Sequence, residues 1–148
     1  MASIQLDVPL VRQDRSMECW YASACMVAYY RAPGPRLGLP DRWIPNEGLP
    51  VDECVRLAKA EHLLVVPMST LHWTAGGLFS LLQTYGPIWC AGFWYGFGHV
   101  VVLTGISDST VSINDPDGPA RKTGTLDWFN DKLAWQVPGC MLYKLEPG

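Results

Sequence analysis

The chain has 148 residues, of which 49% are hydrophobic and 17% are charged, and its formal net charge is −3 at pH 7. This length predicts one domain over residues 1–148 with a single core, and the composition excludes disordered and fibrous proteins. Because the net charge is negative and no run of lysine or arginine occurs, we expect neither nucleic acid nor a membrane as a partner.

The first residues of the chain predict an extended segment followed by a helix. Residues 1–12 alternate weakly between apolar and polar side chains, and they lack the basic and apolar segments of a secretory signal. A helix is predicted from Cys19 to Tyr30, because the prolines and glycine of residues 31–35 cannot continue it. Most faces of this helix are apolar, which is typical of a central helix packed by protein on all sides.

The middle of the chain predicts a long loop and two further helices. Residues 33–49 are rich in proline and glycine and should form the loop. Pro50 and the acidic residues after it suit the first turn of a helix over residues 50–62, and residues 63–66 are a strand candidate. The third helix should run over residues 74–85 and bury Leu78, Phe79, Leu81 and Leu82.

The second half of the chain changes to β-branched and aromatic runs separated by turn residues. These runs predict strands over residues 88–94, 99–106, 110–113 and 139–145, with a short helical piece near residues 126–134. Helices first and strands second indicate an α+β domain with an antiparallel sheet. We therefore expect an N-terminal helical half, with its central helix packed on a C-terminal sheet.

Cys19 stands where the first helix begins, directly after a polar stretch. The free N–H groups and partial positive charge of a helix N-terminus stabilise a thiolate, so this position suits a nucleophile. Cys25, six residues later, faces another direction of the same helix. Position alone leaves open that Cys19 is an inert buried residue of the first turn.

His99 begins a predicted strand, and a buried histidine without a partner would be costly. If the strands over 99–106 and 110–115 form a hairpin that turns near Asp108, paired positions sum to about 217. His99 then lies opposite residues 115–118, close enough for Asp115 or Asn114 to fix its tautomer. The alternative is that both residues belong to an ordinary turn, since the segment that contains them is rich in turn formers.

Gln13 precedes Cys19 by six positions. Its side-chain amide could point with the backbone N–H of Cys19 toward a developing oxyanion, or it could be a solvated loop residue.

The chain has five cysteines, and they show no C-x-x-C and no zinc-finger spacing. An odd number without these patterns favours reduced thiols over a disulfide framework or a metal site, so we expect no metal and no cofactor. The four cysteines other than Cys19 are predicted to be packing residues: Cys25, Cys54, Cys90 and Cys140.

An aromatic segment jointed by glycines directly precedes His99. Its residues Trp94, Tyr95 and Gly98 could form one lip of a substrate groove.

Several motifs occur together: Gln-x5-Cys-Trp, an all-apolar helix, Gly-Pro-Ile before the sheet, Gly-His-Val-Val-Val-Leu-Thr-Gly-Ile, and a following strand that ends in Asn-Asp-Pro. In this order the chain resembles the compact bacterial papain-like cysteine peptidases, and it is similar to the bacteriocin-leader and AvrRpt2-like groups. The resemblance covers Gln13 to Pro116, which is most of the chain.

The resemblance implies roles for four residues. Cys19 would attack a carbonyl, His99 would return the proton to the leaving amine, Asp115 would orient His99, and Gln13 would help to hold the oxyanion. The Asp-Pro ending of the strand favours Asp115 over Asn114 in the orienting role.

We therefore expect a cysteine endopeptidase with a protein substrate. The likeness to bacterial peptidases implies a toxin or effector module. Such a module would be secreted by a route that needs no signal peptide and would act in the cytoplasm of a target cell. The alternative expectation is a cytoplasmic protein. A toxin would also need a cognate inhibitor protein in the producer. The alternatives are a deamidase, transglutaminase or amidase that uses the same Cys-His pair, and an inactive papain-like module that only binds protein.

Overall fold

The structure is a computed structural model, and it describes residues 3–11, 19–31, 55–56, 58–59, 63–68, 72–96, 98–117 and 119–144. Within these ranges the chain forms an α+β fold with three helices and a seven-stranded antiparallel sheet. The elements in chain order are β1 (Ser3–Gln5), α1 (Cys19–Arg31), β2 (Leu64–Val65), α3 (Ala75–Tyr85), β3 (Ile88–Gly92), β4 (His99–Ser107), β5 (Thr110–Asp115), β6 (Ala120–Thr125), α4 (Leu126–Lys132) and β7 (Met141–Tyr143).

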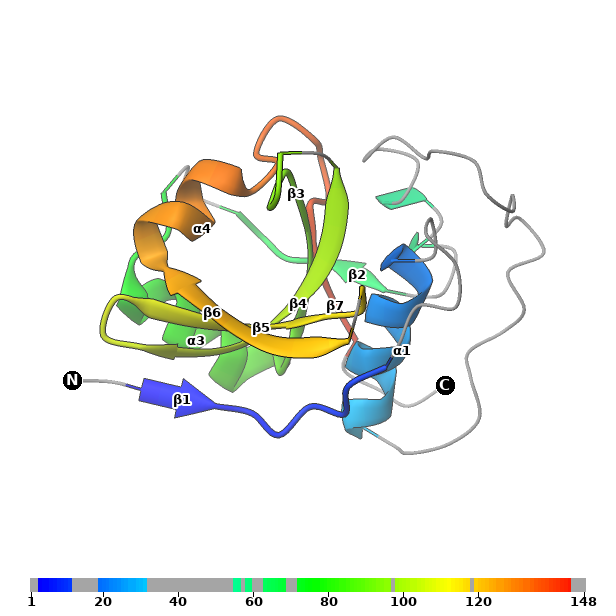
Figure 1. Cartoon of the computed structure of the whole chain (residues 1–148), viewed down its shortest axis with the longest axis horizontal. Coiled ribbons are helices and arrows are strands. Elements are labelled where there is room, and N and C mark those ends of the chain that lie inside the picture. The colour runs from blue at the N-terminus through cyan, green and yellow to red at the C-terminus, as the bar shows by residue number, and fades with distance from the viewer. Residues whose placement is uncertain are drawn as a thin grey trace.

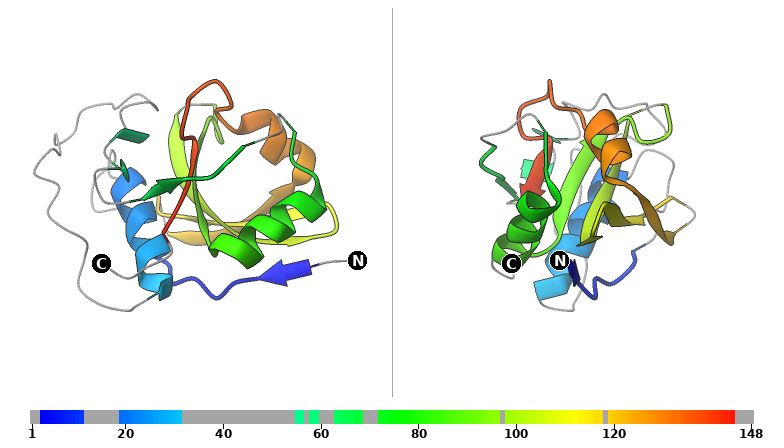
Figure 2. Two further views of the ribbon diagram at one scale, coloured as in Figure 1. Left: turned by 180° about the vertical axis from the view of Figure 1, so that it is seen from behind. Right: turned by 90° about the vertical axis from the view of Figure 1, so that its left-hand side faces the viewer.

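The sheet has the strand order β2-β7-β3-β4-β5-β6, and β1 pairs with the last residues of β4. Figure 1 shows α1 beside the end of the sheet where β4 begins, and α4 next to β6. Helix α3 lies behind the sheet in Figure 1 and in front of it in the reversed view of Figure 2. The predicted α+β fold with an antiparallel sheet is confirmed.

Helix α1 is the central helix that the sequence predicts. Its described side chains from Cys19 to Ala28 are all buried, because protein surrounds the helix on every side. Two hydrogen bonds attach it to the sheet: the indole Nε1 of Trp89 donates to the carbonyl of Trp20 at 3.0 Å, and Ser23 Oγ donates to the carbonyl of Val100 at 3.3 Å. These bonds hold the first turns of α1 against β3 and the start of β4.

Helix α3 begins and ends as its sequence predicts. The Thr74 side chain caps the N-terminus by accepting a hydrogen bond from the N–H of Gly77 at 3.0 Å. Gly86 ends the helix with a positive φ of 77°, which a glycine adopts without strain. Three residues of the predicted buried stripe are buried: Leu78, Leu81 and Leu82. The fourth, Phe79, packs against the core with its side chain only partly covered.

The β4–β5 hairpin turns at Asp108, as predicted, with this residue in the left-handed region at φ 54°. Near the turn the paired positions sum to 217, as in Ser107 with Thr110. A bulge between Leu103 and Gly105 shifts the register, so that Val102 pairs with Asn114 and the sum becomes 216. The hairpin prediction is therefore correct except for one inserted residue.

Strand β6 is absent from the sequence predictions. It pairs with β5 along its whole length, from Thr110 with Thr125 to Asp115 with Ala120. Its residues alternate between exposed and partly buried, and it forms one edge of the sheet. Because an edge strand buries little, its sequence is polar and carries no β-branched or aromatic run that could reveal it.

Several predictions concern residues that lie outside the described ranges. These are Gln13, the loop over 33–49, Cys54 and most of the helix over 50–62. The other four cysteines are all buried, and no disulfide joins them; the packing role predicted for Cys25, Cys90 and Cys140 fits this burial. None of the helices in the described part of the chain has the length and apolar character needed to cross a membrane.

Candidate active site

Cys19 and His99 meet where α1 begins and where β4 begins. Both side chains are buried, with exposed fractions of 6% and 5%. The Cys19 thiol lies next to the His99 imidazole, close enough to help raise the pKa of the ring. The sequence places these residues 80 positions apart, and the contacts of α1 with β3 and β4 bring them together.

Asp115 occupies the other side of the imidazole. Nε2 of His99 lies 2.7 Å from Oδ1 of Asp115, so Nε2–H donates to the carboxylate and Nδ1 remains as the ring nitrogen for Cys19. The register explains this contact. Because Val102 pairs with Asn114, continuing the pairing sets Asp115 opposite Val101, diagonally next to His99 on the same face of the sheet.

Asn114 points the other way and does not contact His99. Its Nδ2 donates to the carbonyl of Val8 at 3.1 Å, on the segment that follows β1. Successive side chains of a strand leave opposite faces of a sheet, so only one of these two neighbours can reach the histidine. Of the two residues that the hairpin argument left open, the structure brings Asp115 to His99.

The surroundings of His99 favour its charged form. Burial disfavours the imidazolium, but hydrogen bonds with Asp115 and Cys19, and the charges of both groups, outweigh burial and raise the pKa of His99 from 6.5 to about 9. An imidazole with this pKa is protonated at neutral pH. It can therefore stabilise a neighbouring thiolate and donate a proton to a leaving group.

Asp115 is ionised although only 1% of it is exposed. Burial alone would raise its pKa, but hydrogen bonds from His99, Lys122 and the backbone N–H of Asp117 hold that pKa well below its ordinary value. Nζ of Lys122 lies 2.8 Å from Oδ2, and the N–H of Asp117 lies 3.0 Å from Oδ1. Each carboxylate oxygen thus has a cationic partner.

Lys122 is not among the predicted site residues, because the strand that carries it, β6, has no pattern that predicts it. The available signal was the proximity of residues 120–125 to the Asn-Asp-Pro-Asp-Gly-Pro segment, whose turn formers permit a second hairpin. A basic residue in the returning strand could then pair with Asp115.

The segment before His99 matches its predicted role only in part. The exposed fractions of Tyr95 and Phe93 are 43% and 37%, and Gly98 is exposed, so these residues are open to a substrate. Trp94 is 1% exposed, donates its Nε1–H to the carbonyl of Cys90 and stacks against Trp128 and Phe129 at centroid distances of 5.3 Å. The prediction that Trp94 lines a substrate groove is wrong, because its indole is part of the core.

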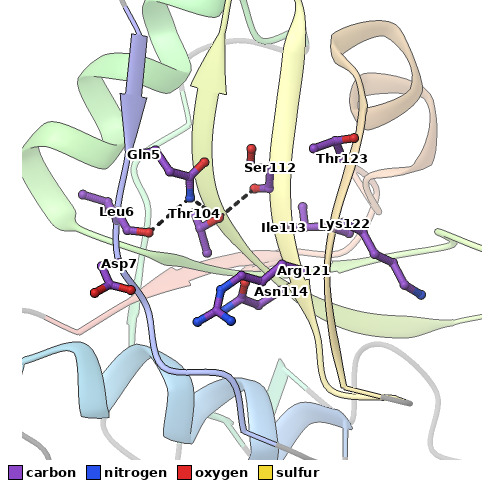
Figure 3. A pocket seen from close by; sticks show the side chains of 10 residues that line it. All are labelled: Gln5, Leu6, Asp7, Thr104, Ser112, Ile113, Asn114, Arg121, Lys122 and Thr123. Carbon is purple, nitrogen blue, oxygen red and sulfur yellow. Dashed lines mark hydrogen bonds between the residues drawn. The ribbon is translucent and has the colours of Figure 1, made fainter.

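A hollow lies beside the residues that follow β1. Figure 3 shows its lining from β1, β4, β5 and β6, with Arg121 and Asn114 on one side and Lys122 extending away from them. The carbonyl of Val8 accepts from both Asn114 and Arg121, at 3.1 and 3.0 Å. The polar groups here attach the N-terminal segment to the sheet.

No group of three or more His, Cys, Asp or Glu side chains with metal-binding geometry occurs among the residues that the structure describes. Gln13 lies outside those residues, so the predicted oxyanion donor stays a prediction.

Known proteins resemble the chain in both family and fold. The family model described as papain-like cysteine protease AvrRpt2 matches residues 2–134. Among solved structures, the chain is similar to a double glycine motif protease from an AMS/PCAT transporter in complex with the leader peptide. The two chains share 18% identity and a TM-score of 0.53 over 97% of each, which shows a common fold. The resemblance to compact papain-like peptidases is confirmed.

Proposed function

Because the chain belongs to the AvrRpt2 family of papain-like cysteine proteases, we propose that it cleaves a peptide bond of a protein substrate through Cys19, His99 and Asp115. The observation that carries this proposal is the position of the His99 imidazole between the Cys19 thiol, which helps to raise its pKa, and the Asp115 carboxylate, whose Oδ1 lies 2.7 Å from Nε2. This is the arrangement of a nucleophile, a general acid–base group and a group that orients it.

The first half of the reaction forms an acyl-enzyme. The Cys19 thiolate attacks the carbonyl carbon of the scissile bond, a C–S bond forms, and the carbonyl electrons move to the oxygen. The oxyanion then collapses, the C–N bond breaks, and the His99 imidazolium gives its proton to the leaving amine. The amine product departs, and His99 is left neutral.

The second half releases the acyl group. Neutral His99 takes a proton from water as the water oxygen attacks the thioester carbon. The C–S bond breaks, the carboxylic acid product leaves, and the thiolate–imidazolium pair is restored. Asp115 keeps the imidazole in the tautomer and orientation that both steps require.

The oxyanion needs hydrogen-bond donors, and two are proposed. The first is the backbone N–H of Cys19, because Cys19 is the first residue of α1 and the N–H groups of a first helical turn point out of the helix end. Gln13 is proposed as the second donor on the basis of the sequence motif.

We also propose small residues next to the scissile bond. The support is the similarity of the fold to a double glycine motif protease. A substrate would approach the Cys19–His99 pair past Tyr95 and Gly98, the exposed residues of the lip.

The biological setting is a further proposal. The motifs resemble those of bacterial peptidases that act as toxins or effectors, which supports export without a cleaved signal, action on a protein in the cytoplasm of a target cell, and a cognate inhibitor protein in the producer. Expressing the wild type and Cys19→Ala in a susceptible cell, and mapping protein fragments in both, tests target and bond together.

The decisive experiment identifies the bond that changes. Candidate protein lysates are incubated with wild type and with Cys19→Ala, and new N-termini are sequenced by mass spectrometry. New N-termini that depend on Cys19 support the peptidase. Unchanged chain lengths with a gain of about 1 Da at glutamine would identify a deamidase, and no change of either kind would favour a binding module.

A further inference from the structure

Asp115 lies on β5, between β4 and β6. Lys122 on β6 contacts it from one side, and His99 on β4 contacts it from the other. Lys122 pairs with Ile113, so it lies diagonally next to Asp115 on the same face of the sheet. Its Nζ is 2.8 Å from Oδ2 of Asp115, while His99 Nε2 is 2.7 Å from Oδ1. The catalytic carboxylate therefore lies between two basic groups.

The change of charge on His99 during the reaction suggests a role for the Lys122 ammonium. While His99 is protonated, the buried Asp115 carboxylate has an opposite charge beside it. After His99 has given its proton to the leaving amine, that charge is lost, and a buried carboxylate with no other cation would tend to take up a proton. Lys122 is protonated at both stages, because its hydrogen bond to Asp115 raises its pKa above the ordinary lysine value.

Tyr95 holds the Lys122 side chain in place. Nζ lies 4.7 Å from the centroid of the Tyr95 ring and 3.4 Å from the Tyr95 hydroxyl, which it can donate to. The same ring lies 6.0 Å from the His99 ring. An exposed lysine usually makes a weak ion pair, but here the partner carboxylate is only 1% exposed, and the ammonium also contacts the ring and the hydroxyl of Tyr95.

We propose that Lys122 is a positioning residue, whose ammonium keeps Asp115 charged and oriented toward His99 throughout the reaction. This inference rests on the proposed function, because it assigns His99 and Asp115 the roles given there.

The proposal makes a prediction about the protonation of His99. Among the described residues, the titratable groups around Asp115 are His99 on β4, Lys122 on β6 and Tyr95 after β3, and Cys19 on α1 faces His99. Removing Lys122 takes a positive charge away from this cluster. His99 then keeps its proton to a higher pH, because losing it would leave the buried Asp115 carboxylate without a cation beside it.

The first measurement does not depend on activity. The protonation midpoint of His99 is followed by long-range ¹H–¹⁵N NMR in Cys19→Ala and in the Cys19→Ala, Lys122→Met double variant. We expect an upward shift of roughly one pH unit in the double variant. Lys122→Gln, which retains a donor and loses the charge, should also shift the midpoint upward.

The second measurement is the rate of peptide cleavage. Lys122→Met should lower kcat roughly tenfold and change KM less than about twofold, because the carboxylate is no longer held in place. Lys122→Arg keeps both the charge and the donor and should restore most of the rate. A merely structural lysine would produce neither the rise in the His99 midpoint nor the rescue by arginine.

Lys132→Met is the matched control. Lys132 is 37% exposed, compared with 40% for Lys122, and it pairs with the exposed Asp131 at 3.5 Å. This variant should leave the His99 midpoint and kcat unchanged.

Two results would overturn the proposal: a His99 midpoint in the folded Lys122→Met or Lys122→Gln variant equal to that of its parent, or the same loss of rate with arginine as with methionine. If the wild type cleaves no peptide at all, the proposed function fails, and the NMR midpoint still decides whether Lys122 acts on the Asp115–His99 pair. Thermal melting of each variant identifies any that does not fold, in which case Lys122→Gln replaces Lys122→Met.

Discussion

The two faces of the β4–β5–β6 sheet use neighbouring residues for different purposes. On one face Asp115 receives hydrogen bonds from His99 and Lys122, and all three groups are charged at neutral pH. On the other face Asn114 and Arg121 donate to one backbone carbonyl, that of Val8. Since strand side chains alternate between faces, one step along β5 separates the carboxylate that contacts His99 from an amide that holds the N-terminal segment.

Substitutions on the two faces should therefore affect different properties of the protein. In the proposed mechanism the charges around Asp115 affect proton transfer, so substitutions there should change rate and pH dependence. The bonds to Val8 attach the N-terminal segment, so substitutions there should change stability and leave the rate alone. Five experiments test this division.

The largest effect is expected from the reacting pair itself. Cys19→Ala and His99→Ala should each lower kcat/KM by roughly 10³-fold or more, because in the proposed mechanism these side chains are the nucleophile and the proton donor. Peptide cleavage measures the loss, and circular dichroism checks the fold. Cys25→Ala, a control on the same helix, should keep activity within about twofold. If activity survives in Cys19→Ala and disappears in Cys25→Ala, Cys19 is not the nucleophile.

The next effect tests the alternation directly. Asp115→Ala should lower kcat by roughly 10²- to 10³-fold, less than loss of Cys19, since Asp115 orients the histidine and does not itself react. Asn114→Ala should change kcat by less than about twofold. Steady-state kinetics on both variants decide the matter. An equal loss in the two would mean that both faces of β5 serve catalysis.

The pH dependence follows from the raised pKa of His99. Activity should fall as pH rises through about 9, where the imidazolium loses its proton. Asp115→Asn should move this limb of the kcat/KM profile downward, toward the ordinary histidine pKa of 6.5, because the carboxylate helps to raise the pKa. A limb that stays near 9 in Asp115→Asn would contradict the electrostatic account of this face.

The same shifts bear on stability, with opposite signs for the two groups. The pKa of His99 is raised on folding, so its contribution is fully present below 6.5 and is lost as pH rises through about 9. The pKa of Asp115 is lowered, so its contribution is present above its ordinary value of 3.8 and is lost only in strong acid. Urea unfolding across this range should give a free energy of unfolding that declines at both ends.

The smallest effect is expected on the structural face. Asn114→Ala and Arg121→Met should each lower the free energy of unfolding by about 1 kcal/mol, because the carbonyl of Val8 keeps one donor in either case. The double variant leaves this buried carbonyl without either donor, so its loss should exceed the sum of the two. Denaturant unfolding of the four proteins measures the coupling. Strict additivity would mean that the two bonds are independent.

Much of the fold could be predicted because the pattern of apolar residues reports burial. The runs that form α1, α3, β3 and β4 are strongly apolar or end at prolines and glycines, and their predicted bounds agree closely with the structure. Strand β6 could not be predicted, since an edge strand with polar residues has no such pattern. The bulge in β4 was equally hidden, because it changes the pairing and leaves the composition unaltered.

The candidate site residues could be read from the sequence: a cysteine at the start of an apolar helix, a histidine at the start of a buried strand, and a carboxylate within reach across one hairpin. Three features follow from the packing of distant elements: the thiol lies next to the imidazole, Trp94 is buried, and Lys122 contacts Asp115. The two sets of features differ in the distance along the chain over which residues interact. Capping, periodicity and hairpin register are local and leave marks in nearby residues, whereas contacts between distant elements depend on how the whole core packs.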